Sequence, residues 1–262
     1  WTWGRNIEGQ LGINDNITRS TPVQEFTSST NWKDVKCNKL SNNVGFMMAI
    51  KSNGTLWTWG WNDYGQLGVN DTISRSTPVQ EWTSSTNWKE ISIGGQLNAY
   101  GIKTDGTLWA WGSNGNGQLC TNDALGRTTP VQEFTSSTNW KTISGGTGYW
   151  MAIRTDGTLW GAGDGTYGKL TVLAGLNYSS PVQELTYSTN WKKISCLSFS
   201  SAIKTDGTLW GWGPNNYGQL ANNSASIAVF SPTQEISKNN FWKEVACGDS
   251  HRASLLYIDS II

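Results

Sequence analysis

The residues of this chain that could do chemistry are few, and their spacing argues against catalysis. His251 is the only histidine in 262 residues, so a histidine-based triad has one candidate base. The serines and carboxylates near it in the sequence form no recognised nucleophile motif. We therefore expect that the chain is not an enzyme and has no catalytic residue.

Four cysteines invite a disulfide or a metal site, but no two have Cys-x-x-Cys spacing. Cys37, Cys196 and Cys247 each lie five residues after the tryptophan of an Asn-Trp-Lys or Phe-Trp-Lys tract, where another copy of the same pattern has Gly145. A slot for a small residue near the centre of the fold explains this better than thiolate ligation. We expect reduced cysteines, no bound metal and no cofactor.

Asp105, Asp156 and Asp206 could be taken for calcium ligands. Each is followed directly by glycine, and an Asp-Gly pair supplies the positive φ angles of a tight β-hairpin. We therefore interpret these aspartates as turn residues in separate hairpins.

Charge and hydropathy exclude several partners. Lys plus Arg and Asp plus Glu both number 19, so no net charge attracts nucleic acid or an anionic membrane. No apolar run approaches the roughly 18 residues that span a bilayer. We expect the chain to be soluble. Its localisation is left open, and a place outside the cell or on the surface of a particle is compatible with the sequence. Because it begins at Trp1, removal of a leader or of upstream repeats is also compatible with the sequence.

Five copies of a repeat of about 50 residues fill the chain. The units cover about 1–56, 57–108, 109–159, 160–209 and 210–262. Each contains a Trp-rich tract, a GQLG-like turn, PVQE, an Asn-Trp-Lys tract and then AIKTDGT or a close variant. Apolar residues alternate with a period of two, which predicts four short strands per unit.

The repeats predict an all-β, single-domain, five-bladed β-propeller with four antiparallel strands in each blade. The last unit offers two strands around Trp242 and Leu256 but no Trp-rich strand after them. The tracts at Trp1 and Val23 match the missing pair. We expect the N- and C-terminal strands to share one blade and to close the ring.

The combination of AIKTDGT, LWAWG, GQLG and SPVQE resembles the regulator of chromosome condensation repeat family, over essentially the whole chain. Its well-known members have seven blades, whereas five are present here. The regularity of these repeats is more similar to bacterial and phage members than to eukaryotic ones. A plant ultraviolet-B receptor of the family uses a tryptophan cluster, but here the 17 tryptophans are expected to pack between blades.

Three functions follow from this resemblance and from the residues. We favour a non-enzymatic scaffold or structural protein that binds a protein partner. This class includes a component of a larger particle such as a virion. The alternative is a lectin-like propeller that binds glycans through aromatic and amide side chains. Guanine-nucleotide exchange, the activity of the founding member, is less well supported, because the net charge is zero and the blade number differs.

The expected binding site lies on one face of the ring. Loops between the first and second strands and between the third and fourth share that face and differ in every copy, whereas TSSTNW on the other face is nearly constant. Positions that the fold does not require are free to serve binding; solvent-facing loops that vary without selection would give the same pattern. The candidate residues are Phe46, Asn98, Tyr149, Trp150, Phe199, His251 and Arg252.

Overall fold

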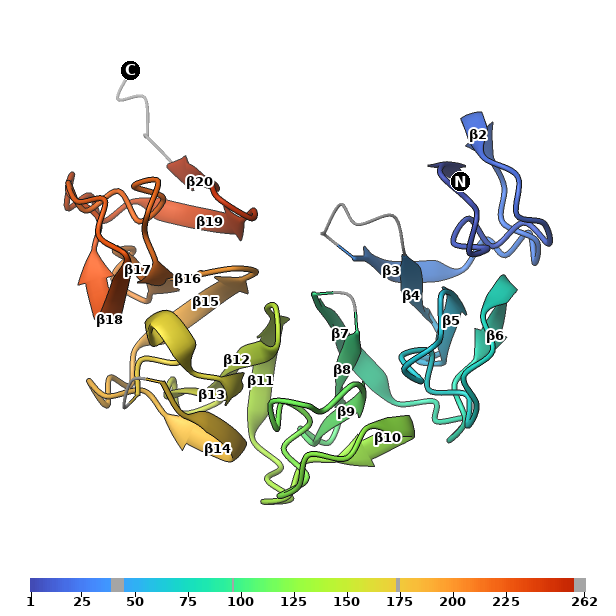
Figure 1. Ribbon diagram of the computed structural model, residues 1–262, viewed down its shortest axis with the longest axis horizontal. Coiled ribbons are helices and arrows are strands. Elements are labelled where there is room, and N and C mark those ends of the chain that lie inside the picture. Colours follow the sequence, from blue (N-terminus) through green and yellow to red (C-terminus); the bar gives the residue numbers. More distant parts are fainter. Residues whose placement is uncertain (39–44, 96, 173–174, 257–262) are drawn as a thin grey trace.

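The computed structural model describes residues 1–38, 45–95, 97–172 and 175–256, and in this part the chain is almost entirely β-structure. The sheets are arranged as an arc around a central axis (Figure 1). The one helical element among these residues is a short 3-10 turn, Thr166–Gly168. No helix found in these ranges is long and apolar enough to cross a membrane.

Four sheets of four antiparallel strands form complete blades, as predicted. Blade 1 contains β3 (Trp32–Cys37), β4 (Phe46–Lys51), β5 (Leu56–Gly60) and β6 (Arg75–Gln80). Blade 2 contains β7 (Trp88–Gly94), β8 (Asn98–Lys103), β9 (Leu108–Gly112) and β10 (Arg127–Gln132). Blade 3 contains β11 (Trp140–Gly145), β12 (Tyr149–Arg154), β13 (Leu159–Asp164) and β14 (Asn177–Gln183). Blade 4 contains β15 (Trp191–Cys196), β16 (Ser200–Lys204), β17 (Leu209–Pro214) and β18 (Ala228–Gln234).

Two further sheets have only two strands each. The N-terminal half-blade consists of β1 (Thr2–Gly4) and β2 (Arg19–Val23), and the C-terminal half-blade consists of β19 (Trp242–Cys247) and β20 (Arg252–Leu256). By sequence they correspond to the outer and inner halves of a blade.

The predicted closure of five blades into a ring is not found among the described residues. β1 pairs with β2 and β19 pairs with β20 in separate sheets, and the two half-blades lie on opposite sides of an opening in Figure 1. The two half-blades therefore remain separate two-stranded sheets in this structure.

Hairpin turns form where the Asp-Gly pairs predict them. Gly106, with φ +79°, lies between β8 and β9, and a Cβ atom there would come within 2.1 Å of the Thr138 carbonyl oxygen. Both the backbone angle and the close approach require glycine. The hairpin therefore rests against the TSSTNW link that leads into the next blade.

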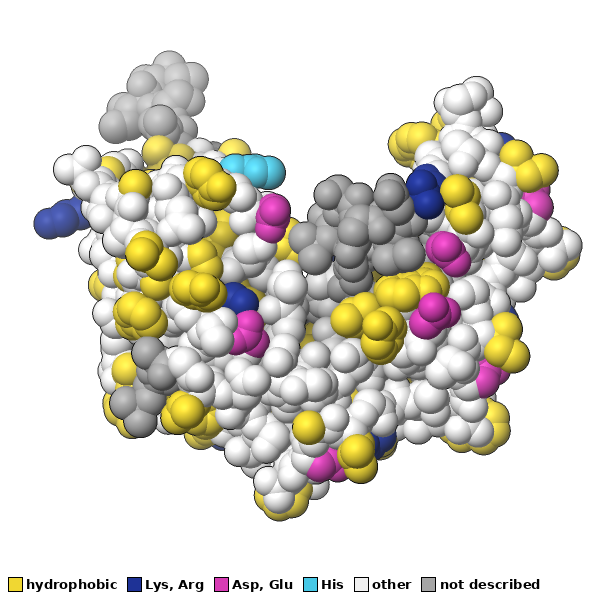
Figure 2. All heavy atoms as spheres, in the orientation of Figure 1, with side chains coloured by type: hydrophobic (Ala, Val, Ile, Leu, Met, Phe, Trp, Pro, Cys, Tyr) yellow, Lys and Arg dark blue, Asp and Glu magenta, His cyan; other side chains and the backbone are white. Residues whose placement is uncertain are grey.

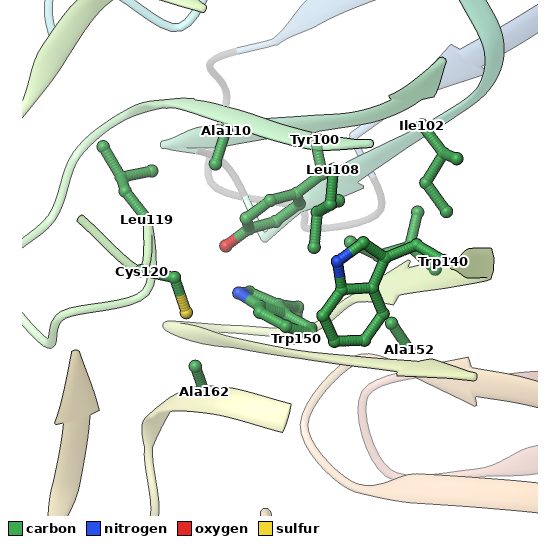
Figure 3. Packing of buried hydrophobic residues seen from close by; sticks show 11 residues of the cluster. Tyr100, Ile102, Leu108, Ala110, Leu119, Cys120, Trp140, Trp150, Ala152 and Ala162 are labelled. Atoms are coloured by element: carbon green, nitrogen blue, oxygen red, sulfur yellow. The ribbon is translucent and has the colours of Figure 1, made fainter. Parts of the chain in front are cut away.

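The hydrophobic core lies between neighbouring blades, as expected for the tryptophans. Figure 3 shows the cluster between blades 2 and 3, in which Tyr100 and Leu119 of blade 2 pack against Trp140 and Trp150 of blade 3. All four side chains are at most 1% exposed. Blade-to-blade packing is thus where most of the apolar surface is buried.

One hydrogen bond recurs at these interfaces. An indole N–H of one blade donates to the main-chain oxygen at the glutamine position of the GQLG-like loop in the preceding sheet. Trp59 donates to Gln10 at 3.0 Å, and Trp111 donates to Gln66 at 2.9 Å. The last glycine of that loop lies directly under the indole, since a Cβ at Gly68 would be 2.8 Å from Nε1 of Trp111.

Blade 3 makes the same bond from a different strand. Its third strand carries Ala162 where blades 1, 2 and 4 carry the second tryptophan, and Trp150 of β12 is paired with Ala162 across the sheet. In blade 2 the corresponding pair is Ala99 with Trp111, so the large and small residues have exchanged strands. Trp150 donates to the Gln118 carbonyl oxygen at 2.9 Å and thereby restores the contact.

We expect Trp111→Phe to lower the free energy of unfolding by about 1–3 kcal/mol, because the buried Gln66 carbonyl loses its indole donor. Trp82→Phe is the matched control, since Trp82 is 59% exposed. Urea unfolding followed by circular dichroism measures both. Equal stability of the two variants would contradict the role assigned to the indole bond.

We expect Trp150→Ala to cost about 3–5 kcal/mol by opening a cavity. The double variant Trp150→Ala/Ala162→Trp should recover most of this loss, because it recreates the arrangement of blade 2. A double-mutant cycle measured by urea unfolding gives the coupling energy. Simple addition of two losses would show that the two strands are not interchangeable at this position.

Candidate binding site

The two faces of the arc are divided as the sequence predicts. The Asp-Gly hairpins and TSSTNW links lie together on what we call the constant face, where Gly54 and Gly106 approach the Thr86 and Thr138 carbonyl oxygens. The opposite side, the variable face, is formed by the loops between strands one and two and between strands three and four of each blade.

Polar side chains on the constant face already have partners within the blade. Glu81 accepts the backbone N–H of Thr83 and Ser85 and the indole N–H of Trp88, at 2.6, 2.9 and 3.1 Å. The glutamate of every other PVQE-like tract binds the following link in the same way: Glu25, Glu133, Glu184 and Glu235. The near identity of TSSTNW among the repeats therefore has a structural cause.

A cation completes the same network. Lys103 Nζ lies 4.8 and 3.9 Å from the ring centroids of Trp88 and Trp109 and donates to Ser85 Oγ at 2.9 Å. Equivalent cations lie between two tryptophans in the other complete blades: Lys51, Arg154 and Lys204. These contacts hold the first and third strands of each blade together.

Four of the residues predicted to bind a partner are instead buried: Phe46, Asn98, Tyr149 and Phe199 are at most 1% exposed. Three of them begin a second strand, at the starts of β4, β8 and β12, and Phe199 directly precedes β16. The three aromatic side chains therefore enter the packing between blades, whereas Asn98 borders the pocket described below. Tyr149 shares a hydrogen bond with Ser200 Oγ at 2.9 Å, and Asn98 donates to the Ser113 carbonyl at 2.6 Å.

Trp150 is also structural, since it makes the inter-blade bond described above and is 1% exposed. The signal for this was present in the sequence, because the only LWxWG tract without its second tryptophan belongs to the same blade.

His251 and Arg252 lie together on the C-terminal half-blade. His251 is exposed and Arg252 is partly buried. The guanidinium of Arg252 donates to Ser201 Oγ and to the Leu220 carbonyl, both at 3.2 Å. Arg252 thus contacts the blade that contains Phe199, whereas Phe46, Asn98, Tyr149 and Trp150 belong to blades 1 to 3, so the seven predicted residues do not form one site.

The cysteines are distributed as the repeats predict. Cys37 is exposed, whereas Cys120, Cys196 and Cys247 are buried, and in the described ranges no disulfide joins them. Burial raises the pKa of the Cys120 thiol well above its usual value. No group of metal-ligating side chains occurs in the same ranges. That the cysteines are reduced and metal-free in solution stays a prediction.

The inner strands border a hollow of about 410 Å³ along the axis. Polar side chains bridge adjacent blades there: Glu90 accepts Thr142 Oγ1 at 2.7 Å, and Lys193 contacts Glu244. The Gly145 N–H donates to Ser92 Oγ at 2.9 Å. These contacts stabilise the spacing between adjacent blades and provide these polar groups with partners.

The variable face contains a polar pocket of about 270 Å³ between blades 2 and 3. It is lined by residues with amide, carboxylate and ammonium groups from strand ends and loops: Asn98, Asn116, Gln118, Asp164 and Lys169. Thr147, in the loop between β11 and β12, is exposed at its border.

An ion pair that the sequence reasoning missed forms one wall of this pocket. Asp164 and Lys169 are joined at 2.5 Å, with their side chains only 16% and 13% exposed. Burial by itself raises the pKa of the Asp164 carboxyl. The hydrogen bonds from Lys169 and Thr166 lower it by more than that, so the pKa of Asp164 lies below the ordinary value. The Asp164 carboxylate is therefore charged at neutral pH.

This ion pair occurs in the one repeat that departs from the pattern. Asn62 Oδ1 accepts the Leu67 N–H in blade 1 and holds its GQLG loop, but blade 3 has Gly165 at the asparagine position and Lys169 at the glutamine position. Asp164 and Lys169 hold the loop of blade 3 instead. The sequence signal for this change is the tract YGKL, which lies where blade 1 has YGQL.

Charged groups are scattered over the surface. The face shown in Figure 2 has isolated acidic and basic side chains and no broad patch of one sign. This distribution agrees with the zero net charge.

Comparison with known proteins relates the chain to several relatives. It is 31% identical over 187 residues to the ultraviolet-B receptor UVR8 of Arabidopsis thaliana, covering 70% of this chain and 41% of that protein. It is 33% identical over 146 residues to the human probable E3 ubiquitin-protein ligase HERC4, covering 55% of this chain and 13% of that protein. The chain thus spans well under half the length of these relatives.

Solved structures share the fold at lower identity. The crystal structure of human WBSCR16 matches 98% of this chain with 67% of its own, with a TM-score of 0.80 and 19% identity. Yeast RCC1 (Prp20), in a structure bound to Kap60, matches 97% of this chain with 75% of its own, with a TM-score of 0.65 and 16% identity. These matches support a β-propeller of about five to six blades.

The regulator of chromosome condensation (RCC1) repeat matches residues 1–38, 53–100, 105–153 and 206–255, and a second description of that repeat matches residues 88–118. The longest stretch between these matches, 154–205, contains the divergent loop of blade 3. With most of its length matched and the repeat order confirmed by four complete blades, the chain belongs to the regulator of chromosome condensation repeat family.

Proposed function

We propose that the chain is a non-enzymatic scaffold that binds a protein partner through its variable face, with the pocket between blades 2 and 3 at the centre of the contact. One observation carries this proposal. The pocket combines an ion pair, Asp164 with Lys169, and exposed loop residues in the one repeat whose loop departs from the pattern of the others.

The chemistry of the pocket suits a polar peptide segment. Amide groups such as that of Asn116 can pair with a peptide backbone, and the charges of Asp164 and Lys169 can orient a partner's polar side chains. The constant face offers less, because its glutamates, cations and indoles already contact one another. Solved structures with this fold agree with a protein-binding role: yeast RCC1 (Prp20) has been solved bound to Kap60, and the binding of Prp20p to Gsp1p and histones has been described.

Glycan binding is less well supported than the sequence suggested. The aromatic residues predicted for the binding face, Tyr149, Trp150 and Phe199, are buried between blades and cannot stack on sugars, whereas others such as Tyr167 and Tyr217 are exposed. Nucleotide exchange, membership of a bacterial or phage group and a place in a virion stay predictions, as does the absence of catalysis.

Thr147→Arg tests the proposed face, because it places a long charged side chain at the border of the pocket without removing a buried contact. Thr138→Arg is the matched control, an exposed threonine on the constant face. The measurement is affinity capture from the native host, followed by binding titration of each captured protein. We expect Thr147→Arg to weaken binding by about tenfold or more and Thr138→Arg to leave it unchanged. Equal loss from both, or loss from the control alone, would assign binding elsewhere.

A further inference from the structure

Blade 2 has an amide side chain where the other complete blades have an aromatic ring. Phe46 and Tyr149 begin the second strands of blades 1 and 3, and Phe199 directly precedes that of blade 4. All three rings lie in hydrophobic clusters between blades. Asn98 begins the second strand of blade 2, and it lines the polar pocket between blades 2 and 3. The change from a ring to an amide therefore coincides with the pocket.

The Asn98 amide uses only its nitrogen within the protein. Its Nδ2 donates to the Ser113 carbonyl at 2.6 Å, whereas no residue in the described ranges donates a hydrogen bond to its Oδ1. The residue is 1% exposed. An amide oxygen that is held away from bulk water without a donor is costly, and an N–H of a ligand in the pocket would remove that cost.

Gln118 has the opposite group available in the same pocket. Its Oε1 accepts the Asn116 N–H at 2.8 Å, and among the residues that the structure describes its Nε2 has no acceptor. Gln66 of blade 1 makes the same bond, from the Tyr64 N–H at 2.9 Å, but it is 0% exposed and its Nε2 is buried. Gln118 is 3% exposed and borders the pocket. The two glutamines thus share a structural role, and only Gln118 faces a cavity.

The charged side chains of the pocket neutralise each other. Asp164 and Lys169 are joined at 2.5 Å, with little of either side chain exposed. A charged ligand group would have to break this pair or be buried without a counterion, and both are costly. The pocket therefore favours an uncharged polar group.

The size and walls of the pocket suit a single side chain. Its volume of about 270 Å³ is below the roughly 300–1,000 Å³ of most small-molecule sites. Four glycines line it, Gly94, Gly95, Gly115 and Gly148, and a Cβ at Gly115 would meet no atom within 4 Å. None of the described lining residues is aromatic, so the pocket has no ring on which a sugar could stack.

We propose that this pocket recognises a primary carboxamide, the end of an asparagine or glutamine side chain. The carboxamide oxygen accepts from Gln118 Nε2, and its NH₂ group donates to Asn98 Oδ1. A carboxamide supplies an acceptor and a donor without a charge, which matches the two amide groups and the closed ion pair. The inference rests on the proposed function only in assigning this side chain to a protein partner.

The first test uses small amides as probes of the 262-residue protein. N-acetyl-L-glutamine methylamide is titrated against the ¹⁵N-labelled protein and followed by NMR chemical shifts, beside the matching glutamate and methionine compounds. All three probes share their backbone amides, so they differ only in the side-chain end. We expect saturable binding of the glutamine compound at about 1 mM, and binding at least about fivefold weaker for the other two, because they leave an amide of the pocket unpaired. No saturable binding, or equal binding of the methionine compound, would overturn the proposal.

The second test places the contact at Gln118. Gln118→Met removes the donor, and Gln66→Met is the matched control, since it loses the same bond to a backbone N–H in blade 1. We expect Gln118→Met to weaken the glutamine compound at least about tenfold and Gln66→Met to leave its binding unchanged. Gly115→Leu fills the pocket without removing a contact and should also abolish binding. Undiminished binding to Gln118→Met or to Gly115→Leu would show that the probe binds elsewhere.

The same variants separate this inference from the proposed function. If the glutamine compound binds and Gln118→Met abolishes its binding, while Thr147→Arg weakens no captured protein, the carboxamide site stands and the proposed protein-binding face is wrong. If Thr147→Arg weakens a captured protein but Gln118→Met does not, the face stands and the carboxamide contact is wrong.

Discussion

The fold depends on one contact, the indole that each blade places over the GQLG-like loop of the sheet before it. The indole supplies apolar area and an N–H donor at once, and the loop supplies a carbonyl oxygen and a position with no room above it. Trp59 above Gly12 and Trp111 above Gly68 show the pair in its usual form. Since the hydrophobic clusters between blades surround this contact, it contributes to the stability of each interface.

Blade 3 shows that the contact, rather than any single position, is what the fold requires. Trp150 and Ala162 exchange the roles that Trp111 and Ala99 have in blade 2, and the indole still reaches its carbonyl. The loop after it has lost the bracing asparagine and is held by Asp164 and Lys169 instead. The same departure from the repeat thus preserves the core and places a buried ion pair on the variable face.

The two faces differ in how far their sequences vary among the repeats, and this follows from which side chains already form hydrogen bonds within their own blade. On the constant face, glutamates such as Glu81 and cations such as Lys103 bind the links and tryptophans of their own blade, which makes those tracts alike in every repeat. Loops of the variable face are not needed in this network. They are therefore free to differ and to supply a surface for a partner.

The sequence alone determined the repeat, the strand order, the Asp-Gly hairpins, the division into two faces and the family, because each depends on local spacing and turn chemistry. It did not determine which aromatic residues are exposed. Phe46, Tyr149 and Phe199 follow variable loops, yet each enters a strand, or directly precedes one, and is covered by the neighbouring blade. Nor did it determine closure, since matching half-blades at Trp3 and Trp242 are a property of the repeat, whereas their pairing depends on tertiary packing, and the structure keeps them as separate sheets. The pairing of Asp164 with Lys169 likewise required the folded loop, which brings a carboxylate and an ammonium group together behind the backbone of a short 3-10 turn.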